Sequence, residues 1–523
     1  MQEDLAPVVQ ADVWAVAAFV GYLLILVGIG AYSARFSSRG IGNFFVGGRV
    51  MNRWVVALSA VVSGRSAWLL LGVTGMAWQM GASALWAVVG YTAVEFFLFF
   101  HFAPRLRRFS EDRDCVTVTD FFAERFQDRR GVLRISLAAV LLVFMTAYVS
   151  AQFVGGGKAI GASFGLDPQF GVLLTAVIVL LYTTVGGFLA VSLTDTLQAA
   201  FMIVALLGIP LLAVTGYGGW GPVFTELAVY QPALVDALSL GGGALLGLVG
   251  IGLGSPGNPH ILVRYMSIRD AKDLRFAAWT GTSANVLMGG GAVLTGLVGR
   301  VYFPELEMLP AQDTENLYPL LAQSLLPSFL FGMVVASIFA AIMSTADSQL
   351  LVGASAVVRD IYEKVIRKGE AIPDRRLVIL SRSVVVLLVM AALLLGWVAE
   401  DLVFWLVLFA WAGLGAALGP TMLLALYWRG TTRAGVLAGV ATGALTTIIW
   451  YLTPALSALM YELIPAFVLA SVVTVVVSRV TRPPPGVARD FQIMEGVLPT
   501  PPPPPRARGG DHLPQGGRPP RAR

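Results

Sequence analysis

The chain has 523 residues, of which 57% are hydrophobic and only 13% are charged, and its mean hydropathy is +0.76. Because a water-soluble protein carries about twice that charged fraction, the composition predicts a polytopic membrane protein without room for a large soluble enzyme domain. The net charge of +5 reflects basic loops on one side of a membrane and does not indicate nucleic-acid binding. Cys115 is the one cysteine, which excludes an intrachain disulfide.

Apolar runs follow one another along most of the chain. A membrane-spanning helix needs about 20 consecutive apolar residues. Thirteen runs meet this length, at 12–33, 54–79, 83–104, 132–156, 168–190, 194–215, 240–263, 276–302, 322–357, 378–398, 401–428, 433–452 and 456–479. The ninth run is too long for one span, so we expect it to continue beyond the membrane or to begin along its surface. Residues 1–480 are therefore expected to form one all-α membrane domain.

Basic residues gather in every second loop, namely after the first, third, seventh, ninth and eleventh runs and in the tail. The alternate segments carry acids, such as Glu3 and Asp4 before the first run and Glu305 and Glu307 after the eighth. By the positive-inside rule, the N-terminus lies outside and the C-terminus lies in the cytoplasm. An odd number of helices requires the same result. The chain is thus expected to be a multi-pass protein of the cell membrane.

The composition changes at about residue 481. Proline runs at 483–485 and 501–505 alternate with arginine and glycine. Such a segment cannot bury a core, so we expect a cytoplasmic tail over 481–523 that is disordered or in a polyproline II conformation. Binding of a partner or of anionic lipid by this tail is an alternative interpretation.

The second run is interrupted by polar residues at Ser63-Gly64-Arg65-Ser66. An arginine at the centre of a spanning helix costs about 2.5–3.5 kcal/mol. Irregular polar backbone at that depth is tolerated where it is buried in protein or lines a cavity. The run therefore predicts a broken helix that builds a solute site.

The seventh run is interrupted as well, because residues 250–260 contain three glycines in alternate positions, two prolines and an asparagine. The second interrupted run follows the first at an offset of five helices. Matching interruptions in two halves of a chain indicate a transporter with an inverted repeat of five plus five helices, here helices 2–6 and 7–11. A simple kink at Pro259 is the structural alternative.

Polar side chains also lie within other runs. Ser344 and Thr345 in the ninth run offer adjacent hydroxyls for a hard cation such as sodium, although hydrogen bonds to their own helix are the alternative. Asp347 lies three residues after Ser344 and therefore on the same helix face.

Glu95 lies among phenylalanines in the third run and needs a partner or a proton. Asp195 near the start of the sixth run fits a capping box with Ser192.

These features, taken with several short motifs, resemble the sodium:solute symporter family and most closely its sodium/proline symporters. The likeness covers about residues 12–480 and includes the motifs at 43–49, 68–72, 186–198, 259–262, 343–345, 349–351 and 410–416. The resemblance implies thirteen helices with a leucine-transporter-type inverted repeat. It also implies a sodium site between the second and ninth helices.

The resemblance assigns roles residue by residue. The implied cation-binding groups are the carbonyls of Val62, Arg65 and Ala341 and the hydroxyls of Ser344 and Thr345. Tyr148 matches a substrate-pocket tyrosine of the family, and Ile251 and Ser255 stand at the aromatic positions that shape the pocket of the proline carriers. With Arg65, Ser66 and Trp68, these are the candidate substrate-binding residues. Asp195 matches an aspartate near the family's inward sodium path, and it joins Glu95 and Asp347 as a candidate for ion coupling.

The sequence departs from the family pattern at the broken second helix. Gly64 stands where the sodium/proline symporters have an aspartate, Arg65 replaces a methionine, and Glu95 replaces a small residue. In one hypothesis, Arg65 sits at the cation site, held by Glu95 or Asp347, and transport is sodium-independent and coupled to protons through one of these carboxylates. In the other, Arg65 binds a substrate carboxylate, and sodium still binds at Ser344 and Thr345.

We conclude from the sequence that the chain is a secondary active transporter of a small organic solute, such as proline, another amino acid or a carboxylate. The coupling ion is sodium or a proton, the surroundings are the lipid bilayer, and we expect no organic cofactor, transition metal or nucleic acid. A transporter-like solute sensor is the rival class. An enzyme is disfavoured, because the runs contain no HExxH or similar metal-ligand motif.

Overall fold

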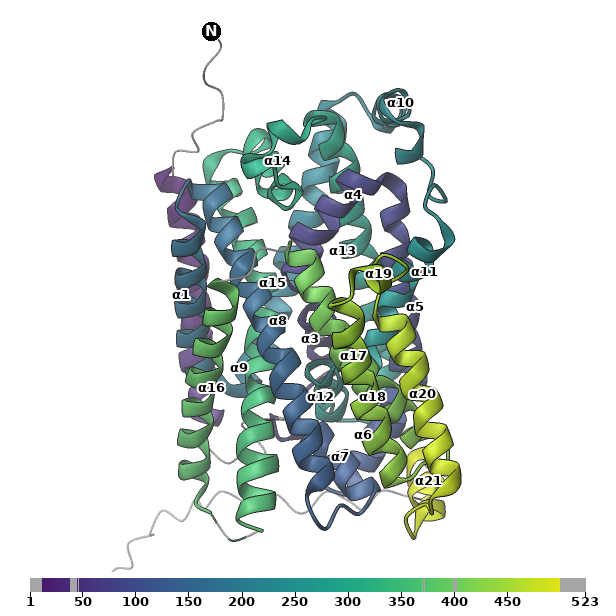
Figure 1. The fold of residues 1–523 in the computed structure, drawn as a ribbon. Helices are drawn as coiled ribbons and strands as arrows, with labels where there is room; N and C mark the ends of the chain where they lie inside the picture. The colour runs from purple at the N-terminus through teal and green to yellow at the C-terminus, as the bar shows by residue number, and fades with distance from the viewer. Residues whose placement is uncertain are drawn as a thin grey trace, which may run out of the picture.

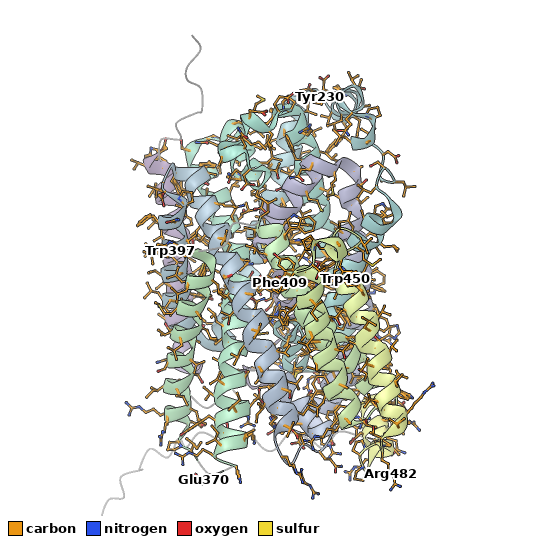
Figure 2. The ribbon with its side chains drawn as sticks, viewed as in Figure 1. Tyr230, Glu370, Trp397, Phe409, Trp450 and Arg482 are labelled. Atoms are coloured by element: carbon orange, nitrogen blue, oxygen red, sulfur yellow. The ribbon has the colours of Figure 1, made fainter. Side chains whose placement is uncertain are left out.

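The computed structural model describes residues 12–498, except for 38–44, 46, 369, 371 and 398–401. The described residues form helices joined by short loops, with one isolated bridge between Met51 and Ile268. Long helices run side by side in a single bundle (Figure 1). Tyr230 lies at one end of the bundle, whereas Glu370 and Arg482 lie at the opposite end (Figure 2). The second end carries the basic loops and is called the basic end below.

Helices account for most of the described residues. In order, they are α1 (Val13–Ser37), α3 (Arg53–Ser63), α4 (Thr74–Met80), α5 (Leu85–Phe97), α6 (Ala103–Asp112), α7 (Val118–Arg125), α8 (Val132–Phe164), α9 (Pro168–Gly216), α10 (Trp220–Tyr230), α11 (Gly242–Gly250), α12 (Pro259–Ser267), α13 (Leu274–Tyr302), α14 (Leu317–Leu325), α15 (Ser328–Ser355), α16 (Asp374–Trp397), α17 (Val403–Tyr427), α18 (Arg433–Tyr451), α19 (Pro454–Ser457), α20 (Leu463–Val480) and α21 (Val487–Glu495). Shorter turns of π- or 3-10-helix include η2 (Trp68–Val73), η4 (Leu98–Phe102), η6 (Ile251–Gly257), η7 (Ala271–Asp273), η10 (Thr314–Asn316) and η11 (Ala356–Ile366).

Ten of the described helices are long and apolar enough to cross a membrane. Shorter apolar helices cover Arg53–Ser63, Pro168–Thr184 and Gly242–Gly257. Each of the thirteen expected runs therefore has a helical counterpart, and the all-α polytopic class is confirmed. The shorter pieces belong to runs in which glycine or proline interrupts the helix, because these residues weaken or break the hydrogen-bonded ladder.

The two expected interruptions are present. α3 ends at Gly64, and Ser66 has a positive φ of 50°, so the chain turns before it resumes in η2. α11 ends at Gly250 and is followed by the 3-10 turns of η6. The backbone of Asn258 is extended, and Pro259 begins α12. Small residues let other helices approach these breaks closely. A Cβ on Gly415 of α17 would lie 2.5 Å from the Cα of Gly254 in η6.

Two boundaries differ from the expected ones. The helices expected at 168–190 and 194–215 meet at Gly187, whose φ of 63° and ψ of −177° break the helical path inside α9. The overlong ninth run divides at Pro327 into α14 and α15, and α15 then continues as the π-helix η11 to Ile366. It therefore both begins in a separate helix and extends past the expected span.

The expectation of a disordered tail from residue 481 is wrong for residues 487–495, which form α21. This helix lies at the basic end beside α6 (Figure 1). Its Asp490 pairs with Arg113 at 2.7 Å, and its Phe491 lies under the guanidinium groups of Arg125 and Arg429. The sequence analysis missed α21 because its four buried residues are flanked by proline-rich chain. Residues 499–523 lie outside the described residues.

Candidate functional site

The centre of the bundle brings α15 against the break of α3. The Ser344 hydroxyl donates to the carbonyls of Ala341, at 3.0 Å, and Val62, at 3.3 Å. The Thr345 hydroxyl donates to the Ser63 carbonyl at 2.9 Å. Both side chains are fully buried. Four of the five residues expected to bind a cation thus converge, and their hard oxygen atoms are the type of ligand that sodium prefers.

The fifth expected ligand is used differently. The carbonyl of Arg65 accepts from the Leu69 N–H at 3.1 Å, where the helix resumes after the break. The Ser63 carbonyl, which the sequence analysis did not single out, instead accepts from the α15 hydroxyl. Such a contact between helices far apart in the chain has no signal in local sequence.

Arg65 extends away from α15 toward α5 and α13. Its Nη2 lies 2.8 Å from Glu95 Oε2, and its Nε lies 2.7 Å from Asn285 Oδ1. The guanidinium carbon lies 3.6 Å from the centre of the Tyr91 ring. The Asn285 amide also donates to the Glu95 carboxylate. Glu95 is therefore the partner of Arg65, as one hypothesis expected, but the pair lies apart from the hydroxyls of Ser344 and Thr345.

Asn285 was missed by the sequence analysis. It is 2% exposed and lies within α13, in a stretch of alanine, valine and glycine. The sequence signal that could have identified it is a lone amide in an apolar helix, because a buried amide must find hydrogen-bond partners. Here its partners are the two charged groups of the Arg65–Glu95 pair.

The structure gives a steric reason for glycine at position 64. The Tyr91 hydroxyl donates to the Gly64 carbonyl at 3.3 Å and occupies the space that a Cβ on Gly64 would fill. That Cβ would also lie 2.9 Å from Cδ1 of Ile261 on α12. The aspartate of the sodium/proline symporters therefore does not fit here unless Tyr91 moves.

An aromatic stack lines the same region. Trp68 stacks between Tyr91 and Phe404, with ring-centre distances of 6.4 and 5.8 Å, and Tyr91 stacks on Trp411 at 5.2 Å. The Trp411 indole donates to the Ile251 carbonyl at 2.8 Å, which ties the stack to the break before α12.

Polar groups around the break complete the candidate substrate pocket. The Tyr148 side chain of α8 lies near the Ser66 hydroxyl, and its ring meets the His260 ring edge-on at 6.0 Å. Gln152 accepts from the Ala67 N–H at 2.9 Å. Several buried polar atoms lack a hydrogen-bond partner among the described residues, namely Trp68 Nε1, Gln152 Nε2, Ser255 Oγ and both ring nitrogens of His260. Buried polar atoms are normally satisfied, so this group indicates a site for a polar ligand.

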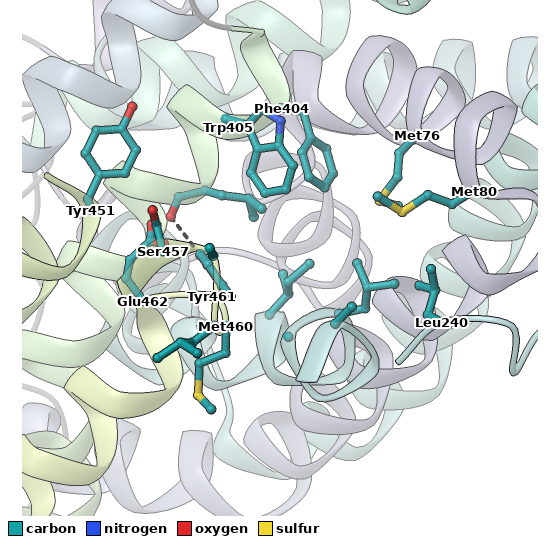
Figure 3. A pocket seen from close by; sticks show the side chains of 17 residues that line it. Met76, Met80, Leu240, Phe404, Trp405, Tyr451, Ser457, Met460, Tyr461 and Glu462 are labelled. Atoms are coloured by element: carbon teal, nitrogen blue, oxygen red, sulfur yellow. Dashed lines mark hydrogen bonds between the residues drawn. The ribbon is translucent and has the colours of Figure 1, made fainter. Parts of the chain in front are cut away.

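A cavity of about 370 Å³ opens beside this pocket. Ile251 and Phe404 lie in its wall, and Phe404 also stacks on Trp68, so the cavity adjoins the aromatic stack. Figure 3 shows Phe404 and Trp405 on one side and Tyr451, Met460 and Glu462 on another. The walls are predominantly apolar. The volume is sufficient for a small solute, since ligand pockets start at about 300 Å³.

A second buried ion pair lies on the basic side of the cation-binding residues. Asp195 accepts from Ser59 at 2.5 Å and Ser63 at 3.3 Å, and it pairs with Arg264 Nη2 at 3.1 Å. Arg264 also donates to the hydroxyl of Ser348. The capping alternative for Asp195 is wrong, because the residue lies inside α9 and bonds to other helices.

Arg264 itself was expected in a basic loop, but it belongs to α12 and is 1% exposed. Its neighbour Asp347 accepts from the Ser348 hydroxyl at 3.2 Å and has no bond to Arg65. The positive charge nearest the α15 carboxylate is therefore Arg264. Sequence alone placed it in the loop because the hydropathy falls off at this point.

The fold and the paired interruptions define a polytopic membrane transporter. The sequence model of the sodium:solute symporter family matches residues 44–443. The chain belongs to this family, whose members couple the movement of a solute to sodium.

Relatives and one solved structure agree with this assignment. The osmoregulated proline transporter OpuE of Bacillus subtilis is 38% identical over 483 residues, which are 91% of this chain and 97% of the relative. A sodium/proline symporter of Staphylococcus aureus is 38% identical over 475 residues, or 88% of this chain and 92% of that protein. A sodium-coupled sialic acid symporter, in an outward-open state, shares the fold with a TM-score of 0.76 at 17% identity, over 91% of this chain and 99% of that one.

Proposed function

We propose that this symporter carries proline or a similarly small amino acid across the cell membrane together with sodium. The observation that carries the proposal is the convergence of Ser344 and Thr345 on the carbonyls of the α3 break, directly beside Ser66 and the Trp68 stack. The names of the relatives point to proline. A pocket of aromatic rings with a few unsatisfied polar atoms suits a small zwitterion with an apolar body.

Sodium would bind between α3 and α15, held by the carbonyls of Val62 and Ala341 and by the hydroxyls of Ser344 and Thr345. In the structure the Ser344 hydroxyl donates to both of these carbonyls, and the Thr345 hydroxyl donates to the Ser63 carbonyl. A cation would accept lone pairs from both kinds of oxygen and turn the hydroxyl protons away. It would thereby link the broken helix to α15, so that ion binding could organise the adjoining solute pocket.

Arg65 would supply a fixed positive charge beside the solute pocket. Its ion pair with Glu95 directs the guanidinium toward α5 and α13, which leaves the hydroxyl site available for sodium. A buried cation next to the pocket favours a solute with a carboxylate. This arrangement supports the hypothesis in which Arg65 serves the substrate and sodium keeps its own site.

Proton coupling through the Arg65–Glu95 pair is the second candidate. It is favoured by one observation, namely that Glu95 Oε1 is buried and without a hydrogen-bond partner among the described residues. Protonation of Glu95 would release Arg65 for the solute carboxylate. In this case sodium would not be required.

Uptake into proteoliposomes distinguishes these candidates. Labelled proline and a panel of amino and carboxylic acids are offered under an inward sodium gradient, an inward proton gradient or neither. We expect sodium-driven uptake of a small amino acid, which Ser344→Ala/Thr345→Ala abolishes and Ser337→Ala preserves, because Ser337 bonds to its own helix and to Tyr318 of α14 but not to the α3 break. Proton-driven uptake that is indifferent to sodium and to Ser344→Ala/Thr345→Ala would overturn the sodium proposal.

The proposed orientation has the N-terminus outside and the basic end in the cytoplasm. Accessibility of cysteines introduced at exposed ends tests it. With Cys115 buried, Tyr230→Cys should react with an impermeant reagent from outside intact cells, whereas Arg482→Cys should react only after the membrane is opened. The reverse pattern would refute this orientation.

A further inference from the structure

The basic end of the bundle contains a groove of about 1120 Å³ that the transport site does not use. Its walls are α6, the segment that joins α12 to α13, and the end of α21 with the residues that follow it. Five basic residues line the groove: Arg105, Arg108, Arg269, Lys272 and Arg275. The groove therefore concentrates positive charge from two segments that are far apart in the chain, α6 and the connection between α12 and α13.

Most of this charge has no ion-pair partner. Within the described part of the chain, no ion pair involves Arg108, Arg269, Lys272 or Arg275, and Arg105 reaches only Glu495, at 3.8 Å. Four acidic residues also line the groove: Glu111, Asp270, Asp273 and Glu495. Glu111 pairs with the buried Arg107 at 3.0 Å. Because Arg107, which does not line the groove, neutralises Glu111, the five basic side chains of the lining face three other acidic ones, which leaves an excess of two positive charges.

The walls of the groove are held in place by backbone contacts. Arg107 donates from Nε to the Ile268 carbonyl at 2.8 Å and from Nη2 to the Arg269 carbonyl at 3.1 Å. The Arg269 N–H in turn donates to the Met51 carbonyl at 2.9 Å. Arg108 donates to the Met494 carbonyl of α21 at 3.0 Å. The cations are thus presented by a cross-linked scaffold and not by a free loop.

Aromatic side chains mark the apolar edge of the groove. Phe100 and His101 line it, and Trp279 packs edge-on against Phe96 and Phe100 at ring-centre distances of 5.4 and 6.0 Å. Trp279 is 63% exposed on the outer surface of the bundle. Tryptophan favours the level at which lipid headgroups meet the acyl chains, so the exposed Trp279 beside the groove indicates a position at the membrane surface.

We propose that the groove binds the phosphate of an anionic phospholipid, whose acyl chains lie along Phe100 and Trp279. Arginine and lysine recognise phosphate oxygens by charge-assisted hydrogen bonds. Basic pockets between helices at the cytoplasmic surface suit such headgroups. A free phosphate ion has the same charged group, but it would make no use of the aromatic edge. This proposal is independent of which solute the protein carries.

Lipid retention by the full-length protein tests the proposal. The protein is placed in nanodiscs of phosphatidylcholine with phosphatidylglycerol, and retained lipids are counted by native mass spectrometry. We expect preferential retention of phosphatidylglycerol, and a decrease in its affinity of about tenfold in Arg269→Gln/Lys272→Gln. Both residues are exposed, so their replacement should leave the fold intact. Arg375→Gln/Arg376→Gln removes the same charge from another exposed segment of the basic end and should change nothing.

Equal retention in the two double variants would overturn the proposal, because it would show only a general attraction to the basic surface. Displacement of phosphatidylglycerol by inorganic phosphate would also overturn it and would assign the groove to a water-soluble anion. Trp279→Ala supplies an independent check. It should weaken the retention of phosphatidylglycerol without any change in charge, whereas binding of inorganic phosphate should be insensitive to it.

Discussion

Two buried arginines, Arg65 and Arg264, lie beside the two interrupted helices. Arg65 is 3% exposed and pairs with Glu95, whereas Arg264 is 1% exposed and pairs with Asp195. They differ in the helices that they connect. The partners of Arg65 lie on α5 and α13, next to its own helix. Those of Arg264 lie on α3, α9 and α15.

This difference indicates two roles for similar ion pairs. Arg65 holds a charge beside the solute pocket and leaves the α3–α15 contact free. Arg264 crosses from α12 to the helices that carry the candidate cation ligands and to Asp195. We therefore expect Arg65 to affect solute binding and Arg264 to affect the movement of helices that opens the basic end.

The largest expected effect follows from removing Arg65. Arg65→Met leaves the Glu95 carboxylate buried without its cation, which costs about 3–5 kcal/mol. We expect a large loss of thermal stability in detergent and no uptake. Arg65→Met/Glu95→Gln should recover much of the stability but not the solute affinity, because the positive charge is still missing. If the double variant transports normally, Arg65 has no role in binding.

Arg264→Gln should also lower the stability, because the buried Asp195 carboxylate loses its cation, and it should have a larger effect on turnover. The variant leaves the carboxylates of Asp195 and Asp347 buried near each other without a cation. Their uncompensated negative charge should hold sodium more tightly on the basic side of the cation-binding residues. We expect the maximal uptake rate to fall about tenfold, equivalent to about 1.4 kcal/mol, while solute binding in detergent is preserved. If Arg264→Gln loses as much solute binding as the Arg65 variants, the proposed separate roles of the two arginines are wrong.

Gly64→Ala probes the contact between the α3 break and Tyr91. The added Cβ meets the Tyr91 hydroxyl and Ile261, and overpacking of this kind costs about 1–3 kcal/mol. Tyr91→Phe removes the hydroxyl, so Gly64→Ala/Tyr91→Phe should be less destabilised than the sum of the two single changes. Thermal unfolding of all three variants measures this coupling, and additive effects would contradict the steric explanation.

Asp490→Asn should have the smallest effect and extends the comparison to a third buried arginine. Arg125 is fully buried, has no hydrogen-bond partner among the described residues, and lies 3.9 Å from Asp490. Loss of this charge from α21 should lower stability by about 1–3 kcal/mol. Glu495→Gln, at an exposed position of the same helix, is the matched control. Equal melting temperatures for the two variants would show that α21 does not stabilise Arg125.

Much of the molecule could be predicted from the order of residues along the chain. The apolar runs, the interruptions at Gly64 and at 250–260, and the family follow from composition and local pattern, because lipid requires each spanning segment to satisfy its own backbone. The convergence of Ser344 on Val62 was expected through the family resemblance. The pairing of Arg65 with Glu95 was one of two hypotheses that the sequence left open.

Other features depended on contacts between distant segments. Asn285, Gln152 and Arg264 became candidates only when their helices met. Arg264 follows the end of an apolar run and so resembles a loop residue, whereas the sequence does not tell which helix the amides of Asn285 and Gln152 face. α21 gains its stability from α6 and from Arg113, and not from its own short sequence. The packing of Tyr91 against Gly64 likewise appears in no local pattern. Which buried carboxylate neutralises which arginine is a property of the tertiary structure, since the strength of an ion pair depends on the distance and burial of both charges.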